Sequence, residues 1–346
     1  MKKVLLAGTA LVGAAMFAAP ASAELKLDLG GHFKGYAVYV DEDAELPNQR
    51  DFEFRKDTEI HFTGETTLDN GLTVGVHIEQ QIEAGNDNNE SYAYFSGGWG
   101  RVNFGNEDGA AYLLQVAAPS ADSNVDGLRT YISGFQSDVN LDYDHAQFGN
   151  GPTQTGADRL TYLSPKFNGF QAGVSYAPEA DLNSGIAAMG TTGAEDLWEI
   201  AARWDGEFSG FGLSVGAGYS TSDNAVAGAA ETEGWNVGAN VAWNQFSFGA
   251  AYLDEEDAEG TVGLDATTWV VGAAWDNGPY HVGASYLTRE DELAGADVDS
   301  YKATIGAGYT FGPGMTFRGA LAWGDAPVAG AEEEFTQVTI GTDINF

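Results

Sequence analysis

The sequence has 346 residues, 15 basic and 51 acidic side chains, a formal net charge of −36, and no cysteine. A surface this acidic excludes nucleic acid and anionic lipid headgroups as electrostatic partners and favours cations. Without cysteine the chain forms no disulfide and offers no thiol for lipid attachment.

Residues 1–23 have the features of a cleaved signal peptide. A positive start with two lysines precedes a short apolar run, and Ala21 and Ala23 form an A-x-A cleavage site. The apolar run is short for a membrane-spanning helix. We therefore expect export, cleavage before Glu24, and a mature domain over residues 24–346 with a formal charge of −38.

The mature region contains many aromatic residues although it is strongly acidic. It holds no stretch approaching 18 consecutive apolar residues, so membrane helices are excluded. Yet the chain has 8 Trp, 15 Tyr and 19 Phe, which are many for a water-soluble acidic protein. No linker or composition break divides the region, which favours a single domain.

Alternation with a period of two residues recurs almost to the C-terminus. In the run from Trp235 to Trp243 every second residue is apolar, and the residues between are small or polar. The two tryptophans lie about 26 Å apart at ~3.3 Å per residue. That spacing approaches the outward apolar band of outer-membrane barrels, which aromatic girdles flank at about 25 Å. A soluble β-sandwich also alternates, but it gathers its aromatics in the middle of the core.

Counting these runs predicts a 16-stranded antiparallel transmembrane β-barrel in the outer membrane, because short turns and longer acidic loops follow one another in alternation. An even strand number brings the last strand beside the first and leaves no edge unpaired in lipid. The predicted strands cover 25–40, 51–68, 71–84, 89–97, 100–107, 157–166, 169–178, 193–207, 211–222, 232–244, 245–254, 264–277, 279–291, 297–311, 314–325 and 333–346.

The last predicted strand ends in an aromatic residue. Val338, Ile340 and Ile344 share one face with Phe346. A C-terminal aromatic on such a row resembles the signal that outer-membrane assembly machinery reads, so we expect that machinery, outer-membrane lipid and lipopolysaccharide as partners.

The segment Arg159–Tyr176, R-L-T-Y-L-S-P-K-F-N-G-F-Q-A-G-V-S-Y, resembles a strand–turn–strand unit of Gram-negative general porins, in particular their alphaproteobacterial branch. The turn Leu68–Leu72 and the run Gly100–Gly105 fit this family too. The resemblance covers the mature chain and implies a homotrimer of sixteen-stranded barrels, each with its third external loop folded into the lumen as an eyelet. The chain lacks the P-E-F-G-G-type sequence of that loop, and its wall carries fewer arginines than is usual.

The interval from about residue 106 to residue 157 shows no alternation, and a loop this long inside a domain is normally functional. We predict that it folds into the lumen and narrows the pore. Its acids outnumber its bases by six and would face basic residues on the wall, which predicts a transverse field and a preference for cations. The predicted loop acids are Asp108, Asp122, Asp126, Asp138, Asp142 and Asp144, beside Glu107 and the single base Arg129. Strand parity turns several bases inward: Lys34, Arg55, Arg101, Arg159, Arg203, Lys302 and Arg318. The predicted wall bases of the constriction are Lys34, Arg55, Arg101 and Arg159, because their strands lie early and near the base of the loop.

No cofactor is predicted, and the five histidines show no metal-ligand spacing in the sequence. The acidic stretches 254–259 and 332–334 are predicted to be external loops, and divalent cations at them would bridge to lipopolysaccharide. Neither stretch fits a calcium-binding loop.

The predicted function is passive diffusion of small hydrophilic solutes and ions. No enzymatic activity is predicted. Two alternatives remain open, a solute-specific channel and a plugged structural or adhesive barrel, and an outer-membrane hydrolase is a third hypothesis against which the sequence argues. A solute-specific channel would use a row of inward aromatics, which the sequence pattern does not show. A plugged barrel with sixteen strands would need an extra domain to fill its lumen, and the sequence does not suggest one. The motif G-x-S-x-G at Gly212–Gly216 lies within an alternating run and not at a strand-to-helix turn, which argues against the hydrolase.

Overall fold

The computed structural model describes residues 25–43, 50–82, 88–145, 157–180, 194–224, 231–258, 261–293, 296–328 and 330–346. The predicted cleavage site at Ala21, Ala23 and Glu24 lies outside these residues, as does the part of the long interval from 146 to 156.

Sixteen strands and one short helix, α2 (Ala110–Leu113), make up the described regular structure. None of the described helical residues forms a helix long and apolar enough to cross a membrane. The strands are β1 (Lys26–Glu42), β2 (Phe52–Thr67), β3 (Thr73–Gln81), β4 (Asn88–Gly97), β5 (Gly100–Asn106), β6 (Asp158–Leu163), β7 (Phe170–Glu179), β8 (Ala194–Phe208), β9 (Phe211–Asn224), β10 (Thr232–Trp243), β11 (Phe246–Glu256), β12 (Leu264–Asn277), β13 (Tyr280–Leu293), β14 (Ala296–Gly312), β15 (Met315–Val328) and β16 (Ala331–Asn345).

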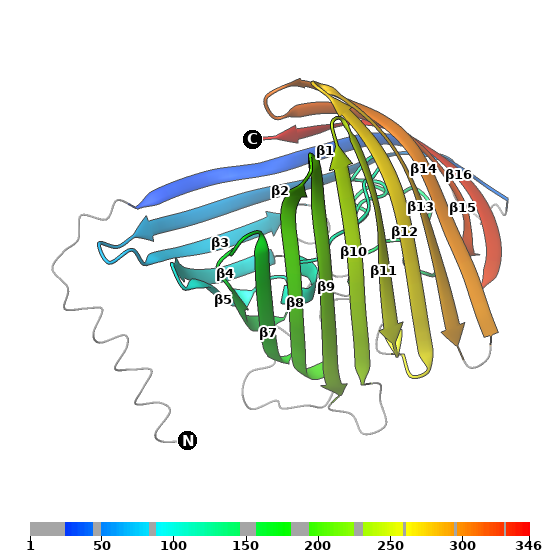
Figure 1. The fold of residues 1–346 in the computed structure, drawn as a ribbon. Helices are drawn as coiled ribbons and strands as arrows, with labels where there is room; N and C mark the ends of the chain where they lie inside the picture. The colour runs from blue at the N-terminus through cyan, green and yellow to red at the C-terminus, as the bar shows by residue number, and fades with distance from the viewer. Residues whose placement is uncertain are drawn as a thin grey trace.

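The strands form a closed antiparallel barrel. Each strand pairs with its neighbours in sequence, and β1 pairs with β16 to close the ring, where the blue and red strands lie side by side in Figure 1. The predicted 16-stranded antiparallel barrel is therefore confirmed, and every predicted strand end lies within three residues of the observed one. The acidic stretches predicted as loops differ: Asp254–Glu256 continues β11, and Glu332–Glu334 lies within β16.

The closing seam extends to the last residue of the chain. The Gly31 amide donates to the Phe346 carbonyl oxygen at 3.0 Å, and the Phe346 amide donates back to Gly31 at 3.1 Å. A Cβ on Gly31 would lie 2.2 Å from the carbonyl oxygen of Glu59, so the backbones approach too closely here for any other residue.

Side-chain parity separates an apolar outer face from a polar inner face. On β10, Trp235 and Trp243 are exposed on the outside (43% and 51%), whereas Asn236 on the other face is 1% exposed. Closure pairs the strand edges and places apolar side chains toward lipid, which is the arrangement that a spanning sheet requires.

The main buried cluster lies inside the barrel and joins the wall to the segment after β5. Tyr36 and Val38 of β1 and Phe335 of β16 pack there with Ile132 and Phe135 of that segment. The rings of Phe135 and Phe335 stack at a centroid distance of 4.0 Å. The barrel interior is therefore partly filled by side chains of the segment.

Candidate functional site

The site consists of the described segment 107–145 and the inward-facing side chains of the wall. Hydrogen bonds and close packing connect this segment with β1 and with strands from β7 to β16. Because α2 is its only regular element, the position of the segment depends on these contacts with the wall.

The start of α2 is fixed by two wall side chains. The Ala110 amide donates to Ser175 Oγ at 2.8 Å, and the Ala111 amide donates to Glu199 Oε2 at 2.9 Å. Glu199 Oε1 accepts a hydrogen bond from Arg159 at 2.7 Å, and both side chains of this ion pair are nearly inaccessible. Arg159, predicted to face the permeant, is thus a buried partner of the carboxylate that anchors α2.

Beyond α2 the backbone of the segment lies directly on glycines of the wall. A side chain at any of these positions would occupy the place of a backbone carbonyl oxygen, so only glycine leaves room for the segment. We call this row the glycine track. Its members and the distances from an added Cβ to the facing oxygen are Gly216 to Leu114 (2.7 Å), Gly238 to Val116 (1.7 Å), Gly272 to Pro119 (1.9 Å) and Gly283 to Ser120 (2.3 Å).

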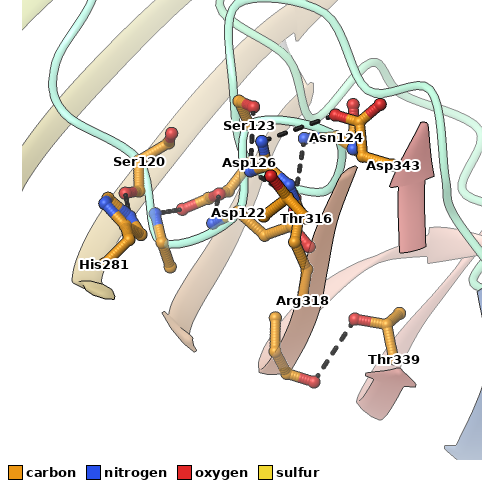
Figure 2. A network of polar contacts seen from close by, with 12 residues as sticks. Ser120, Asp122, Ser123, Asn124, Asp126, His281, Thr316, Arg318, Thr339 and Asp343 are labelled. Carbon is orange, nitrogen blue, oxygen red and sulfur yellow. Dashed lines mark hydrogen bonds and ion pairs between the residues drawn. The ribbon is translucent and has the colours of Figure 1, made fainter. Parts of the chain in front are cut away.

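Asp122 joins the segment to both sides of the barrel seam. Its carboxylate, 1% exposed, accepts a hydrogen bond from Tyr36 Oη of β1 at 3.0 Å. Arg318 of β15 donates to the same carboxylate at 3.3 Å (Figure 2). It also accepts the Asn124 amide at 3.1 Å. Burial raises the pKa of Asp122, and the Arg318 guanidinium opposes that shift. This predicted loop acid therefore has a structural anchoring contact.

Asp126 closes a tight turn within the same stretch. Its two carboxylate oxygens accept the amides of Ala121 at 2.7 Å and Asp122 at 2.8 Å, and Ser285 of β13 donates to it as well. One residue before the turn, His281 donates to the Ser120 carbonyl oxygen at 3.1 Å (Figure 2). The carboxylate of Asp126 is thus used by backbone and wall donors.

Two further acids of the segment, Asp138 and Asp142, accept hydrogen bonds from backbone amides. Asp142 accepts the Thr130 amide at 3.0 Å, while Lys302 of β14 donates to the Leu141 carbonyl oxygen at 2.7 Å. Asp138 is exposed, and its carboxylate accepts a hydrogen bond from the Gly330 amide at 2.8 Å.

Arg129, the single base of the segment, forms ion pairs with two acids of the segment, Asp144 and Asp108. It donates to Asp144 at 2.9 Å, lies 3.7 Å from Asp108, and covers the ring of Tyr112 at 4.7 Å. Burial raises the pKa of Asp144 to about 7 against the influence of Arg129, and burial likewise raises the pKa of Glu107 to about 7. Near neutral pH these two carboxyls are only partly charged.

His145 ends the described part of the segment in a neutral contact with the wall. Its Nε2 lies 2.7 Å from Ser220 Oγ of β9, and its Nδ1 lies 2.8 Å from the Asn236 amide nitrogen of β10. Burial lowers the pKa of His145 to about 4, so the imidazole is uncharged at neutral pH.

The other predicted wall bases lie on β1, β2 and β5. Lys34 Nζ is 3.3 Å from Asp57 and 3.1 Å from the centroid of the Tyr131 ring, so it contacts the segment directly. Arg55 pairs with Glu53 at 3.1 Å, and both side chains are well exposed. Arg101 lies 4.0 Å from the centroid of the inward-facing Tyr94 ring and donates to Asn103 at 2.6 Å.

Two features escaped the sequence reasoning. Basic residues on distant strands contact the segment, as Lys302 and Arg318 do, although the prediction favoured bases near its start. An inward row of rings also exists on the early strands, contrary to the pattern reading. The row runs through His32, His61, His77, Tyr92 and Tyr94, with successive ring centroids 5.4–6.4 Å apart. The alternation of each strand, which turns these bases and rings toward the lumen, was the signal in the sequence from which both features could have been found.

The sequence comparison decides the family. Residues 7–327 match the model of the Gram-negative porin family. The chain belongs to the Gram-negative porin family. It is therefore an outer-membrane β-barrel protein of a family of channels without enzymatic activity, which confirms the predicted location and excludes the hydrolase. The motif Gly212–Gly216 accordingly lies within β9. No curated protein matches the sequence.

Solved porins share the fold at low sequence identity. OmpT of Vibrio cholerae is 14% identical with a TM-score of 0.66, covering 95% of this chain and 100% of that one. An anion-selective porin from Comamonas acidovorans is 16% identical with a TM-score of 0.64, covering 93% and 100%. A double mutant of Rh. blastica porin is 20% identical with a TM-score of 0.61, also covering 93% and 100%.

Proposed function

We propose that this porin lets small hydrophilic solutes and ions diffuse passively across the outer membrane, through a lumen that the segment of residues 106–157 narrows. The observation that carries this proposal is the row of contacts between residues 107–145 and the inner face of β1 and β7–β16. Inward-facing side chains on β2, such as Arg55 at 39% exposed, still reach water. The passage then runs between the segment and the arc β2–β5.

We further propose that the passage prefers cations. The segment has seven acids and one base over residues 107–145, and within a pore narrower than the ~8 Å Debye length that charge is not screened. The Comamonas neighbour is described as anion-selective although it shares the fold. The sign of selectivity must therefore come from the charges that each chain carries. Among the acids of this segment, Asp138 is exposed and Asp142 and Asp144 are partly exposed, whereas Asp108 is 8% exposed.

A homotrimer is the assembly that we propose. One OmpT structure is described as a trimer form, and at 14% identity it supports a homotrimer for this chain as a proposal. Four further proposals rest on the sequence. The chain belongs to the alphaproteobacterial branch, it is cleaved after Ala23, assembly machinery recognises Phe346, and the barrel contacts lipopolysaccharide.

The inward row of rings supports a second candidate function, that of a solute-specific channel. Tyr92 is partly exposed and lies 5.8 Å from Arg101, so its ring can stack with a flat or sugar-like solute, whereas Tyr94 is 4% exposed with Arg101 over its ring. Competition by one sugar or aromatic solute for ion current, absent with a size-matched solute, distinguishes this function from general diffusion.

The decisive experiment is planar-bilayer recording of the purified protein under a KCl gradient. Steps in groups of three, with a reversal potential showing K⁺ preferred over Cl⁻, are expected for a trimeric pore with an acidic constriction. Absence of steps contradicts the diffusion channel and favours a plugged barrel. Steps with anion preference keep the channel and overturn the role given to the segment.

A further inference from the structure

Three residues on neighbouring strands β2 and β3 bring metal-binding atoms together on the inner wall. One ligand atom from each of His61, His77 and Glu79 lies within 4.8 Å of the others. Glu79 Oε1 is 2.8 Å from His77 Nε2 and 3.6 Å from His61 Nδ1. The alternation of the strands and the pairing of His61 with Glu79 in the β2–β3 register create this cluster, which sequence spacing does not reveal.

Each histidine has a partner that orients its ring. His77 Nδ1 is 2.7 Å from Thr63 Oγ1, and His61 Nε2 is 3.2 Å from Glu59 Oε2. If each of these nitrogens donates its proton to that oxygen, His77 Nε2 and His61 Nδ1 both turn a lone pair toward Glu79. Histidines that bind metals are typically held this way, by a hydrogen bond from the other ring nitrogen.

The ligand set selects a class of metal. Two imidazoles and one carboxylate suit Zn²⁺ and its first-row neighbours, whereas Ca²⁺ and Mg²⁺ prefer oxygen ligands. Three protein ligands leave a tetrahedral position for water. The side chains of His61, Glu79 and His77 are 31%, 21% and 18% exposed, so hydrated ions in the lumen reach them.

A second cluster, formed by His32, Glu59 and His61, is less suited to a cation. His32 Nε2 already contacts Asp57 at 2.6 Å, and the side chains of His32 and Glu59 are about 10% exposed. Asp57 also pairs with Lys34 at 3.3 Å, which brings a positive charge beside the cluster. The cluster on β2 and β3 is therefore the better site.

We propose that His61, His77 and Glu79 bind one divalent transition-metal ion of the zinc class per chain, on the wall of the pore. Thr63 and Glu59 are positioning residues for the two imidazoles. The binding step stands without the proposed function. Its consequence rests on that function: a bound ion adds two positive charges to the wall and thereby lowers the preference of the passage for cations.

The test uses the purified, folded full-length porin in detergent, titrated with Co²⁺ and then with Zn²⁺. We expect a visible ligand-field band that saturates at one Co²⁺ per chain and is removed by Zn²⁺ but not by excess Mg²⁺. His77→Gln removes the band, while Thr63→Val, which keeps the shape of the side chain, weakens Co²⁺ binding by about 10–100-fold. His32→Gln retains the band.

The outcomes separate the proposals. Each variant is first checked for an intact barrel by its resistance to unfolding in cold detergent. No saturable band in the parent, or a band that survives His77→Gln, overturns the site, and loss through His32→Gln alone moves binding to the second cluster and overturns it too. Current steps recorded without metal test the proposed function independently, and a Zn²⁺-induced shift of the reversal potential toward zero connects the two.

Discussion

The two arcs of the barrel wall follow the same alternating pattern but present different inward residues. On β9, β10, β12 and β13 the inward face carries the glycine track, and backbone of the segment lies on it. On β1, β2 and β3 the same face carries His32, His61 and His77, which form a row of rings. The size of the inward residue therefore determines where the backbone of the segment can lie directly on the wall and where side chains separate the two.

The arcs also differ in how they use charge. Around β13–β16 the charged side chains of wall and segment meet in direct contacts, as in the pair of Arg318 with Asp122. On the early strands, charges such as Arg55 and Glu53 are paired with each other and remain exposed. The acids of the segment consequently divide into anchoring acids and acids that can act on a permeant.

The largest effect is expected from filling the glycine track. Gly238→Ala places a methyl group 1.7 Å from the Val116 carbonyl oxygen, so the segment must leave this position. We expect larger and noisier current steps, and a loss of about 1–3 kcal/mol of unfolding free energy from overpacking. Single-channel recording and urea unfolding measure the two effects.

Gly212→Ala is the matched control for this change. Gly212 also faces inward, on β9, but an added Cβ would meet its nearest atom, Ala242 Cβ, at an ordinary 3.5 Å. Equal conductance changes in the two variants would contradict the account of the glycine track.

An intermediate effect is expected at the anchoring acids. Asp122→Asn removes the charge that faces Arg318 and disturbs contacts of a residue that is 1% exposed, at a cost of about 1–3 kcal/mol in unfolding free energy. Asp138→Asn keeps an oxygen for the Gly330 amide at an exposed residue, so we expect less than about 0.5 kcal/mol. Urea unfolding of both variants checks the order, and equal losses would show that Asp122 is no anchor.

The smallest effect is a pH dependence of selectivity. Burial raises the pKa of Glu107 to about 7, so this group loses its charge as the pH falls from 8 to 6. The ratio of K⁺ to Cl⁻ permeability should fall over that interval, and Glu107→Gln should reduce the change. Because Asp144 also has a pKa of about 7, the variant Glu107→Gln with Asp144→Asn should reduce it further. Reversal potentials at each pH provide the measurement, and an unchanged pH response in both variants would exclude these groups.

The same pKa shifts predict the sign of the effect on stability. A carboxyl with a raised pKa binds its proton more tightly in the folded state than in the unfolded chain, where the value is about 4.3 for Glu. Its contribution to stability is complete below about pH 4 and is lost as the pH rises through about 7.

The strands were predictable because each one repeats a two-residue period that the membrane enforces. On β10, for example, Trp235 faces outward and Asn236 faces inward, as the alternation in the sequence predicts. The turn residues between the runs mark where each strand begins and ends. The continuation of β11 through Asp254–Glu256 was missed because acidic residues suggest a loop. In the structure Glu255 faces inward, 5% exposed, and pairs with Arg289 at 3.2 Å, which makes the acid compatible with a strand.

The arrangement of the site was predictable only in part. Parity indicated that Arg159 and Arg318 face inward, but it does not tell which inward residue the segment reaches. That choice depends on the path of the segment, which glycines on β9–β13 set at positions far from it in sequence. Arg159 thus lies in a buried ion pair, whereas Arg318 contacts Asp122. The metal-binding cluster likewise depends on the register between β2 and β3.

The seam between β1 and β16 sets the order in which the molecule is completed. Residues His32 and Asn345 are partners across it, although 313 positions separate them, whereas every other strand pairs with an immediate neighbour. Ring closure is thus the pairing with the largest sequence separation, and its entropic cost is met last. Until then one edge of β1 carries unpaired backbone groups that lipid cannot satisfy. Insertion must therefore be guided by something that holds this edge, or be delayed until the final strand is present.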